Sequence, residues 1–325
     1  MSRALITGIA GFAGSHLAEL LLAEGLDVCG LDRNGMSLTN IRGFKKHLQL
    51  RELDILDSRA VEKAVGDLQP DLIFHLAAVA YVPHAQYYPS FVFDVNAQGT
   101  LHLLQACKNQ APGARLIIIS SSQVYGQIPP ARLPLTERAR PRPNNVYALS
   151  KLCSEEMALL YQREYNLKAI ILRPFNHIGP RQRPVFVVAD LASQIARIEA
   201  GRQEAVLNVG DLSSARDFTD VRDMVRAYYL AAERGIPGQI YNLSSGRAWK
   251  IEAIVKKLLS LSNRKIEVKT EKKRFRGQDI SILYGKSDKF RRATGWKPRH
   301  RLRESLENVM NYWRKNYPPA SSSKK

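Results

Sequence analysis

Short apolar runs, many of them rich in β-branched residues, alternate with amphipathic stretches through the first half of the chain. The apolar runs predict strands at residues 4–7, 27–31, 48–50, 72–76, 116–119 and 169–172. The amphipathic stretches predict helices at residues 14–24, 58–67 and 100–109, the second with Asp57 or Ser58 as its N-cap. Strands that are apolar on both faces and alternate with helices are typical of parallel sheets. The pattern therefore predicts an α/β fold with a doubly wound parallel sheet.

The pattern changes after Arg173 and Pro174, where loops lengthen and Gly-Pro and Arg-Pro steps interrupt the chain. We therefore predict a first domain of residues 1–173 and a smaller C-terminal α/β domain of residues 174–317. Whether segments of the second domain return to the first is left open. Residues 318–325 are typical of a disordered tail.

The composition of the 325-residue chain, 45% hydrophobic and 24% charged, is that of a soluble globular protein. Cys29, Cys107 and Cys153 are too few and too scattered for a disulfide framework or a metal site. We therefore expect no metal and a reducing, cytoplasmic location. No apolar run reaches the length of a membrane-spanning helix, so we also expect no membrane partner.

The net charge of +19 is concentrated at one end of the chain. Residues 1–246 carry 26 Lys and Arg against 23 Asp and Glu, whereas residues 247–325 carry 23 against 7. This excess indicates an anionic partner, such as a nucleotide, a nucleic acid or an acidic surface. Aromatic residues in the basic part are sparse, which is unlike a base-stacking platform. A nucleic-acid-binding protein is therefore an alternative that we disfavour.

Three glycines, Gly8, Gly11 and Gly14, lie between the first predicted strand and the first predicted helix. Backbone without Cβ at this position lets a pyrophosphate approach the helix N-terminus, where free N–H groups stabilise its charge. Asp32 follows the second strand and could accept hydrogen bonds from the adenosine ribose, which favours NAD. Arg33 beside it could bind a 2′-phosphate, so the choice between NAD and NADP stays open.

Tyr147 and Lys151 are four positions apart and would share one face of a helix. A phenol has a pKa of roughly 10 and is a poor proton relay at neutral pH. An ammonium one turn away, together with a positive nicotinamide ring, would lower that pKa. Tyr147 could then donate a proton to a substrate oxygen while a hydride arrives at the carbon.

These motifs resemble the extended short-chain dehydrogenase/reductase superfamily, which has the same Gly-x-x-Gly-x-x-Gly spacing. The resemblance implies a Rossmann fold, bound NAD(P)H, and Ser121 as a hydrogen-bonding group for the reacting oxygen, beside the catalytic Tyr147 and Lys151. It also implies a homodimer. The cofactor contacts that it implies are Gly8, Gly11, Phe12, Ala13, Gly14, Asp32, Arg33, Asp54, Ile55, Leu76, Ala77, Ala78, Asn96, Tyr147 and Lys151.

The segment around Gln123 bears on the reaction type. Sugar-nucleotide 4,6-dehydratases of the superfamily carry a Glu at the position of Gln123, sometimes with an Asp before it. Elimination of water needs a base for the C5 proton and an acid for the departing hydroxyl. The amide of Gln123 and the hydroxyl of Ser122 cannot do that work at neutral pH. Hydride transfer alone is left: reduction, oxidation or epimerisation.

The second half of the chain resembles the nucleotide-sugar side of the same superfamily, and most of all the GDP-4-dehydro-6-deoxy-D-mannose reductases that form GDP-D-rhamnose. This resemblance implies NAD(P)H-dependent reduction of the C4 ketone of a GDP-4-keto-6-deoxy-hexose. A nucleotide-sugar 4-epimerase is the first alternative and a GDP-mannose 4,6-dehydratase the second. The substrate contacts that the resemblance implies are Tyr81, Ser122, Gln123, Asn176, Val187, Arg216, Arg276 and Asp279.

Overall fold

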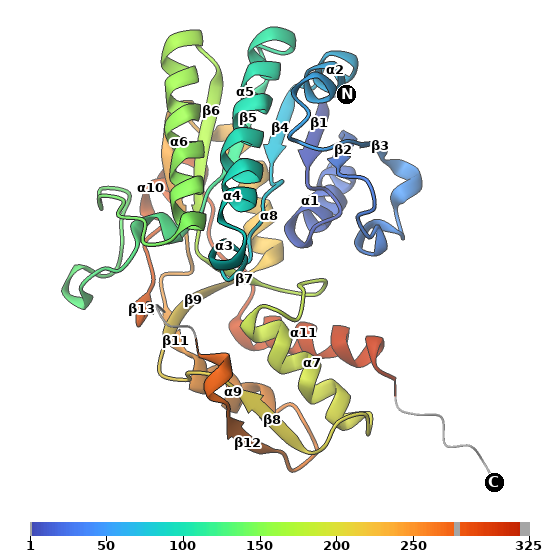
Figure 1. The fold of residues 1–325 in the computed structure, drawn as a ribbon, viewed down its shortest axis with the longest axis vertical. Helices are drawn as coiled ribbons and strands as arrows, with labels where there is room; N and C mark the ends of the chain where they lie inside the picture. The colour runs from blue at the N-terminus through green and yellow to red at the C-terminus, as the bar shows by residue number, and fades with distance from the viewer. Residues whose placement is uncertain (1, 276–279, 319–325) are drawn as a thin grey trace.

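The larger part of the protein consists of a seven-stranded parallel sheet and the helices that cover it (Figure 1). The computed structural model describes residues 2–275 and 280–318. The strand order is β3-β2-β1-β4-β5-β6-β10, and each neighbouring pair is parallel. The strands are β1 (Arg3–Thr7), β2 (Asp27–Asp32), β3 (Gln49–Glu52), β4 (Leu72–His75), β5 (Arg115–Ile119), β6 (Lys168–Pro174) and β10 (Ile240–Leu243). The order reverses between β1 and β4, which is where sheets of this kind bind ligands.

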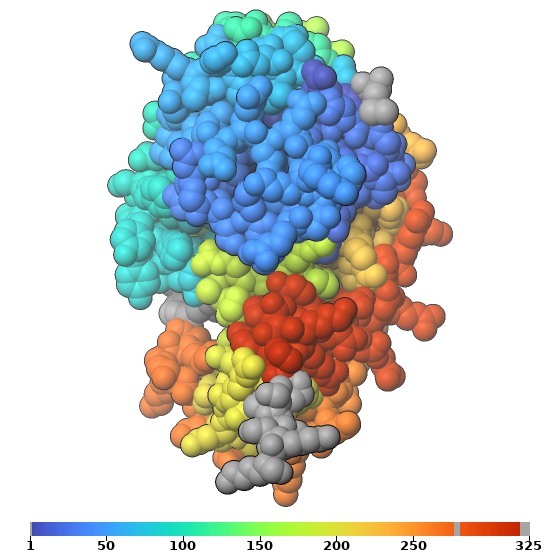
Figure 2. All heavy atoms as spheres, turned by 90° about the vertical axis from the view of Figure 1, so that its right-hand side faces the viewer, coloured from blue at the N-terminus to red at the C-terminus, as the bar shows by residue number. Residues whose placement is uncertain are grey.

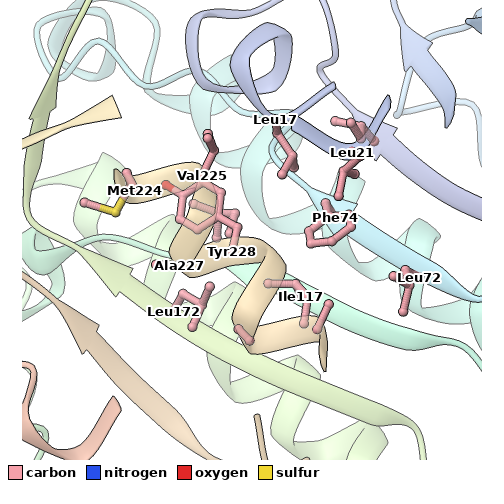
Figure 3. Packing of buried hydrophobic residues seen from close by; sticks show 14 of the residues in the cluster. Leu17, Leu21, Leu72, Phe74, Ile117, Leu172, Met224, Val225, Ala227 and Tyr228 are labelled. Atoms are coloured by element: carbon pink, nitrogen blue, oxygen red, sulfur yellow. The ribbon is translucent and has the colours of Figure 1, made fainter. Parts of the chain in front are cut away.

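Helices cover both faces of this sheet. One face packs against α1 (Phe12–Ala23) and α8 (Val221–Arg234), and the other against α2 (Ser58–Leu68), α5 (Gly99–Gln110) and α6 (Val146–Tyr165). Figure 3 shows Tyr228 and Val225 of α8 facing Phe74, Ile117 and Leu172 of the strands. The prediction of a doubly wound α/β sheet is confirmed, and the six predicted strands coincide with β1 to β6 within a few residues.

The predicted helices also form, with ends set by local capping. The Asp57 carboxylate accepts a hydrogen bond from the Ala60 N–H at 3.0 Å, so Asp57 rather than Ser58 caps α2. The predicted helix at residues 100–109 is the end of a longer run. That run comprises α3 (His84–Tyr87), α4 (Pro89–Phe93), a π-helical turn (Asp94–Gln98) and α5.

A second lobe is built from the later part of the chain around its own apolar core (Figures 1 and 2). Its strands are β7 (Asn176–Ile178), β8 (Val206–Val209), β9 (Ala215–Asp220), β11 (Ala248–Lys250), β12 (Glu267–Thr270) and β13 (Ile282–Leu283). Its helices are α7 (Val187–Glu199), α9 (Ile251–Leu259) and α11 (Leu302–Asn316). β7, β11 and β13 pair with β9, and β12 pairs with β8.

Several segments beyond residue 174 belong to the large sheet and its cover. Strand β10 is the outer strand beside β6, and α8 packs on the sheet. Helix α10 (Asp288–Thr294) and Trp296 contribute buried rings to the same core. Residues 319–325 of the predicted tail lie outside the described residues. Within the described part of the chain, no helix is long and apolar enough to cross a membrane.

Candidate functional site

The glycine loop follows β1 at the carboxyl edge of the sheet. Gly8 has a φ of +74°, and a Cβ there would lie 2.9 Å from the Ala77 nitrogen. A Cβ on Gly14 would lie 2.3 Å from the Gly8 carbonyl oxygen, and Gly11 is the N-cap of α1. Only glycine fits this turn, so the loop holds the first N–H groups of α1 open towards a ligand.

Two predicted cofactor residues in this loop are tied to the protein through their side chains. The Phe12 ring stacks on His177 with centroids 5.6 Å apart, and it meets His16 edge-on at 5.7 Å. Ala13 packs against the apolar core that α1 and α8 form with the sheet. Their backbone, at the first turn of α1, is therefore the part that a cofactor could contact.

Asp32 ends β2 and reaches the glycine loop. Its Oδ2 atom accepts a hydrogen bond from the Ala10 N–H at 2.9 Å. Burial raises the pKa of Asp32, and hydrogen bonds from Ala10 and Arg33 N–H groups oppose that rise. The Arg33 side chain is exposed. Both residues lie where the sequence predicted, and their geometry does not choose between NAD and NADP.

Tyr147 and Lys151 lie on the first two turns of α6, which Asn145 caps by accepting the Ala148 N–H at 2.8 Å. Tyr147 is 8% exposed and Lys151 is 3% exposed. Ser121 follows β5, and its hydroxyl is hydrogen-bonded to that of Tyr147. The structure thus brings together Ser121, Tyr147 and Lys151 at the carboxyl ends of the strands.

Burial shifts the pKa values of both Tyr147 and Lys151. In the protein alone, burial raises the pKa of Tyr147, and the hydrogen bond with Ser121 is the contact that lowers it. The prediction that Lys151 and a positive nicotinamide ring together lower the tyrosine pKa concerns the protein with its cofactor bound, and it stays a prediction. Burial lowers the pKa of Lys151 to about 8, against the attraction of Glu155. The reason is desolvation, which disfavours the charged form of both groups.

The loop after β4 carries Leu76, Ala77 and Ala78 and is fixed from both sides. Thr7 accepts a hydrogen bond from the Ala77 N–H at 3.1 Å. Asn96, in the π-helical turn, accepts the Val79 N–H at 2.8 Å and donates to Ser150 of α6 at 3.0 Å. The buried Asn96 thus joins this loop to α6, and its predicted contact with the cofactor stays a prediction.

The two residues predicted at the adenine end differ in their surroundings. Asp54 is exposed, and its carboxylate accepts the Leu56 N–H at 2.9 Å. The Ile55 side chain is buried in the core between α2 and α5, and its carbonyl oxygen is hydrogen-bonded to His102. The Ile55 side chain therefore does not face a ligand, and any contact of this residue is through its backbone.

The predicted substrate residues come from separate elements. Ser122 and Gln123 begin a short 3-10 turn (Ser122–Tyr125) after β5, and Val187 is the first residue of α7. Asn176 begins β7, which pairs with β9. Arg216 of β9 is 6% exposed, and one of its nitrogens donates to the Ala215 carbonyl at 2.9 Å.

Tyr81 lies between the two lobes. Its ring is 6.1 Å from that of Phe186, the residue before α7, and 5.2 Å from that of His84. These edge-on contacts bring the loop after β4 against the residue that precedes α7 of the second lobe. Arg276 and Asp279, also predicted as substrate contacts, lie outside the described residues.

Sequence reasoning missed a buried ion pair one helical turn beyond Lys151. Glu155 of α6 is fully buried and accepts three hydrogen bonds from Arg173 of β6, at 2.9, 3.1 and 2.5 Å. The signal was present, because Tyr147, Lys151 and Glu155 recur at four-residue spacing on one helix face. A lone Glu on a helix is usually exposed, so the spacing alone does not predict a buried functional residue.

Asp217, next to Arg216 on β9, anchors the loop that follows β10. Its carboxylate accepts hydrogen bonds from the Ser245 N–H at 2.8 Å, the Ser245 hydroxyl at 2.6 Å and the Gly246 N–H at 2.9 Å. Burial nevertheless raises the pKa of Asp217 to about 6. The folded protein therefore binds this proton more tightly than the unfolded chain does.

This shift predicts a pH-dependent stability. Below the unfolded pKa the carboxyl is protonated in both states, and the stabilisation by Asp217 is complete; it is lost as the pH rises through about 6. Between pH 4 and pH 7.5 we expect the free energy of unfolding to fall by about 2 kcal/mol relative to the Asp217→Asn variant. Urea unfolding of both proteins at the two pH values measures the difference. An unchanged difference would contradict the buried, proton-binding carboxyl.

Comparison with known proteins identifies the family to which this chain belongs. A family profile described as GDP-mannose 4,6 dehydratase matches residues 5–309. The chain belongs to this family. GDP-6-deoxy-D-mannose reductase of Pseudomonas aeruginosa, a family relative, is 34% identical over 314 residues, covering 96% of this chain and 97% of that protein.

Solved structures show the same fold in enzymes of different reaction types. The structure of RMD from Pseudomonas aeruginosa complexed with NADPH has a TM-score of 0.85 and 34% identity, covering 97% of this chain and all of that one. UDP-glucose 4-epimerase of Thermus thermophilus in complex with NAD has a TM-score of 0.86 and 30% identity, covering 96% and 99%. The resemblance to extended short-chain dehydrogenases/reductases is confirmed. Membership of the family does not by itself settle the reaction.

Proposed function

We propose that the protein is an NAD(P)H-dependent reductase that converts GDP-4-dehydro-6-deoxy-D-mannose into GDP-D-rhamnose by reducing the ketone at C4. The observation that carries the proposal is the 34% identity to GDP-6-deoxy-D-mannose reductase over nearly the full length of both chains. The grouping of Ser121, Tyr147 and Lys151 supports a carbonyl–alcohol interconversion as the reaction type.

The residues after β1 and β2 fit a dinucleotide. The tight glycine turn keeps the first N–H groups of α1 accessible to a pyrophosphate. Asp32 would bind the adenosine ribose, and Arg33 would accommodate a 2′-phosphate. When bound, the cofactor supplies the hydride that reaches C4. One similar structure contains NADPH and another contains NAD, so both forms of the cofactor are candidates.

Tyr147 would donate the proton that turns the C4 oxygen into a hydroxyl. Its raised pKa keeps the phenol protonated at neutral pH, as an acid must be before the reaction. Ser121, hydrogen-bonded to the same phenol, would hold the ketone oxygen and polarise it. Once the proton has left, the ammonium of Lys151 one turn away stabilises the phenolate.

We further propose that the substrate lobe recognises the nucleotide diphosphate. Arginine suits this purpose because its planar fork binds two phosphate oxygens at once. Arg216 lies on the strand that pairs with β7, so it is held by the sheet rather than by a loop. The residues proposed to contact the substrate are Tyr81, Ser122, Gln123, Asn176, Val187, Arg216, Arg276 and Asp279.

Gln123 supports reduction over dehydration. It lies in the turn after β5, two residues beyond Ser121, and its backbone N–H donates to the Ser121 hydroxyl at 3.1 Å. An amide neither takes nor gives a proton at neutral pH, so it cannot supply the acid and base that elimination of water requires.

The test is a cofactor-oxidation assay with purified protein. GDP-4-dehydro-6-deoxy-D-mannose with NADPH, and separately with NADH, is expected to oxidise one cofactor per sugar reduced. GDP-mannose serves as the control, and with it we expect no 4-keto product. Interconversion of sugar epimers without net cofactor oxidation would replace the proposal by a 4-epimerase. Salt-sensitive RNA or DNA binding without turnover would replace it by a nucleic-acid-binding protein.

We propose that the protein is a homodimer through the face formed by α3, α4 and α6. Supporting this, Tyr87 is 76% exposed and Tyr88 62% exposed, and Leu149, Leu160 and Tyr165 of α6 are each more than 40% exposed. Clustered exposed apolar residues mark interaction sites. A monomeric mass in light scattering at micromolar concentration would refute the dimer.

We assign the protein to the cytoplasm. Cys29, Cys107 and Cys153 are free thiols, and burial raises the pKa of Cys107 to about 12, which makes it inert. Free thiols are typical of a reducing compartment. Recovery of the native protein outside the cytoplasmic fraction would contradict the assignment.

A further inference from the structure

A buried carboxylate lies one helical turn beyond the catalytic lysine. Tyr147, Lys151 and Glu155 follow one another at four-residue spacing on α6, so they share the face that packs on the sheet. Their exposures are 8%, 3% and 0%. A charged side chain at full burial requires partners, because its hydration is lost. Glu155 therefore cannot be a solvated surface residue.

Glu155 is fixed from two strands of the sheet. Arg173 of β6, itself 2% exposed, donates from Nε to Oε1 at 2.9 Å and from Nη2 to Oε2 at 2.5 Å. The hydroxyl of Ser120, at the end of β5, donates to Oε1. Both carboxylate oxygens are thus bound, which holds the charge at one place beside the catalytic face.

The arginine is fixed in turn by elements beyond the catalytic helix. Its guanidinium lies 4.8 Å from the centre of the Tyr125 ring. The Tyr125 hydroxyl donates to the Asn242 side chain at 2.7 Å, and the Asn242 N–H donates to the Glu137 carboxylate at 2.8 Å. The position of Glu155 is therefore set by a continuous polar network that reaches strand β10.

Five titratable groups lie on Lys151's own helix and on the strands and the turn next to it. They are His75 from β4, Tyr125 from the turn after β5, Tyr147 and Glu155 from α6, and Arg173 from β6. Burial and Lys151 lower the pKa of His75 to about 3, so it is neutral and adds no charge. Of the charged groups, Glu155 is the one that opposes the effect of burial on Lys151.

We propose that Glu155 is a positioning residue that acts on the reaction through Lys151: held by Arg173 and Ser120 one helical turn away, the buried carboxylate keeps the Lys151 ammonium charged beside Tyr147. The inference rests on the proposed reductase function, in which Lys151 stabilises the tyrosine phenolate and binds the cofactor ribose. Without the carboxylate, the buried ammonium loses its nearest negative charge and gives up its proton at lower pH.

The test compares Glu155→Gln with wild type across pH 6 to 10. The variant is expected to show the alkaline fall of kcat at a pH about one unit lower, so that kcat at pH 8.5 drops by roughly tenfold. The KM for the keto sugar should stay within threefold. Glu156→Gln, the exposed neighbour on the same helix, is the matched control and should keep the wild-type profile. An unshifted profile in folded Glu155→Gln would overturn the proposal.

Glu155→Gln leaves Arg173 buried without its partner, so this variant could lose activity simply because it is destabilised. A second variant separates that effect from an effect on Lys151. In Glu155→Gln/Arg173→Gln both charges are removed, and we expect the melting temperature to recover while the alkaline fall stays shifted. The shift persists because Glu155, and not Arg173, supports the lysine charge. A wild-type profile in the double variant would overturn the proposal. If neither variant folds, Glu155 has a structural role, and the proposal is overturned as well.

Cofactor binding separates this inference from the proposed function. NADPH fluorescence titrations at each pH report on Lys151 without turnover, since its ammonium would bind the ribose. The same downward shift is expected for the pH at which NADPH affinity falls in Glu155→Gln. If wild type binds NADPH and does not reduce the keto sugar, the proposed function fails. The effect of Glu155→Gln on the pH dependence of binding still decides the inference.

Discussion

Replacing Tyr147 by phenylalanine is expected to lower kcat for reduction of the keto sugar by about 10³-fold. A positioned general acid contributes typically 10²- to 10⁴-fold, and the phenol is the group hydrogen-bonded to Ser121 at the carboxyl end of β5. Phenylalanine keeps the ring that packs against Ala85 and Val92, so the variant should fold. The loss should appear in kcat, because the ring remains and only the proton donor is removed.

The control for this variant lies on the same helix. Tyr165 is 46% exposed at the end of α6, and Tyr165→Phe should leave kcat within twofold. NADPH affinity of Tyr147→Phe should stay within about fivefold of wild type, since Lys151 and the glycine loop are unchanged. Stoichiometric NADPH oxidation at more than a tenth of the wild-type rate would show that another group supplies the proton.

Much of the site could be predicted because its parts are local in sequence. The glycine turn needs only three positions between a strand and a helix, and Tyr147 and Lys151 need only one helical turn. Parallel strands put their carboxyl ends at one edge, so Ser121 after β5 and Gly8 after β1 are predicted to lie at the same edge of the sheet. The sheet could be predicted for the same kind of reason, because each strand and each helix is marked by its own local pattern of apolar and polar residues.

Contacts between distant segments could not be predicted in this way. Nothing in residues 221–243 marks α8 and β10 as part of the first domain's sheet, because one apolar face fits either lobe. The Arg173–Glu155 pair joins a strand to a helix through burial that the sequence does not display. The tyrosine pKa also depends on burial, which raises it in the protein alone and which the charges along the helix do not reveal.

Replacing Gly14 by alanine is expected to raise the dissociation constant of NADPH by at least 100-fold. The added Cβ would lie 2.3 Å from the Gly8 oxygen and 2.9 Å from the Ile9 Cα, both backbone atoms that no rotamer change can move. The clash must push α1 away from the turn after β1, which displaces the N–H groups aimed at the pyrophosphate. Alanine's higher helix propensity, worth about 1 kcal/mol, is smaller than the roughly 1–3 kcal/mol that overpacking typically costs.

Gly43→Ala is the matched control, because Gly43 is exposed and a Cβ there meets no atom within 4 Å. It should bind NADPH within twofold of wild type and melt at the same temperature. Gly14→Ala should melt several degrees lower and lose the fluorescence change of bound NADPH. If Gly14→Ala bound NADPH normally while folded, the pyrophosphate would not lie at the start of α1. The cofactor would then have to be sought away from the glycine turn, and the proposed roles of Tyr147 and Lys151 would lose their geometric basis.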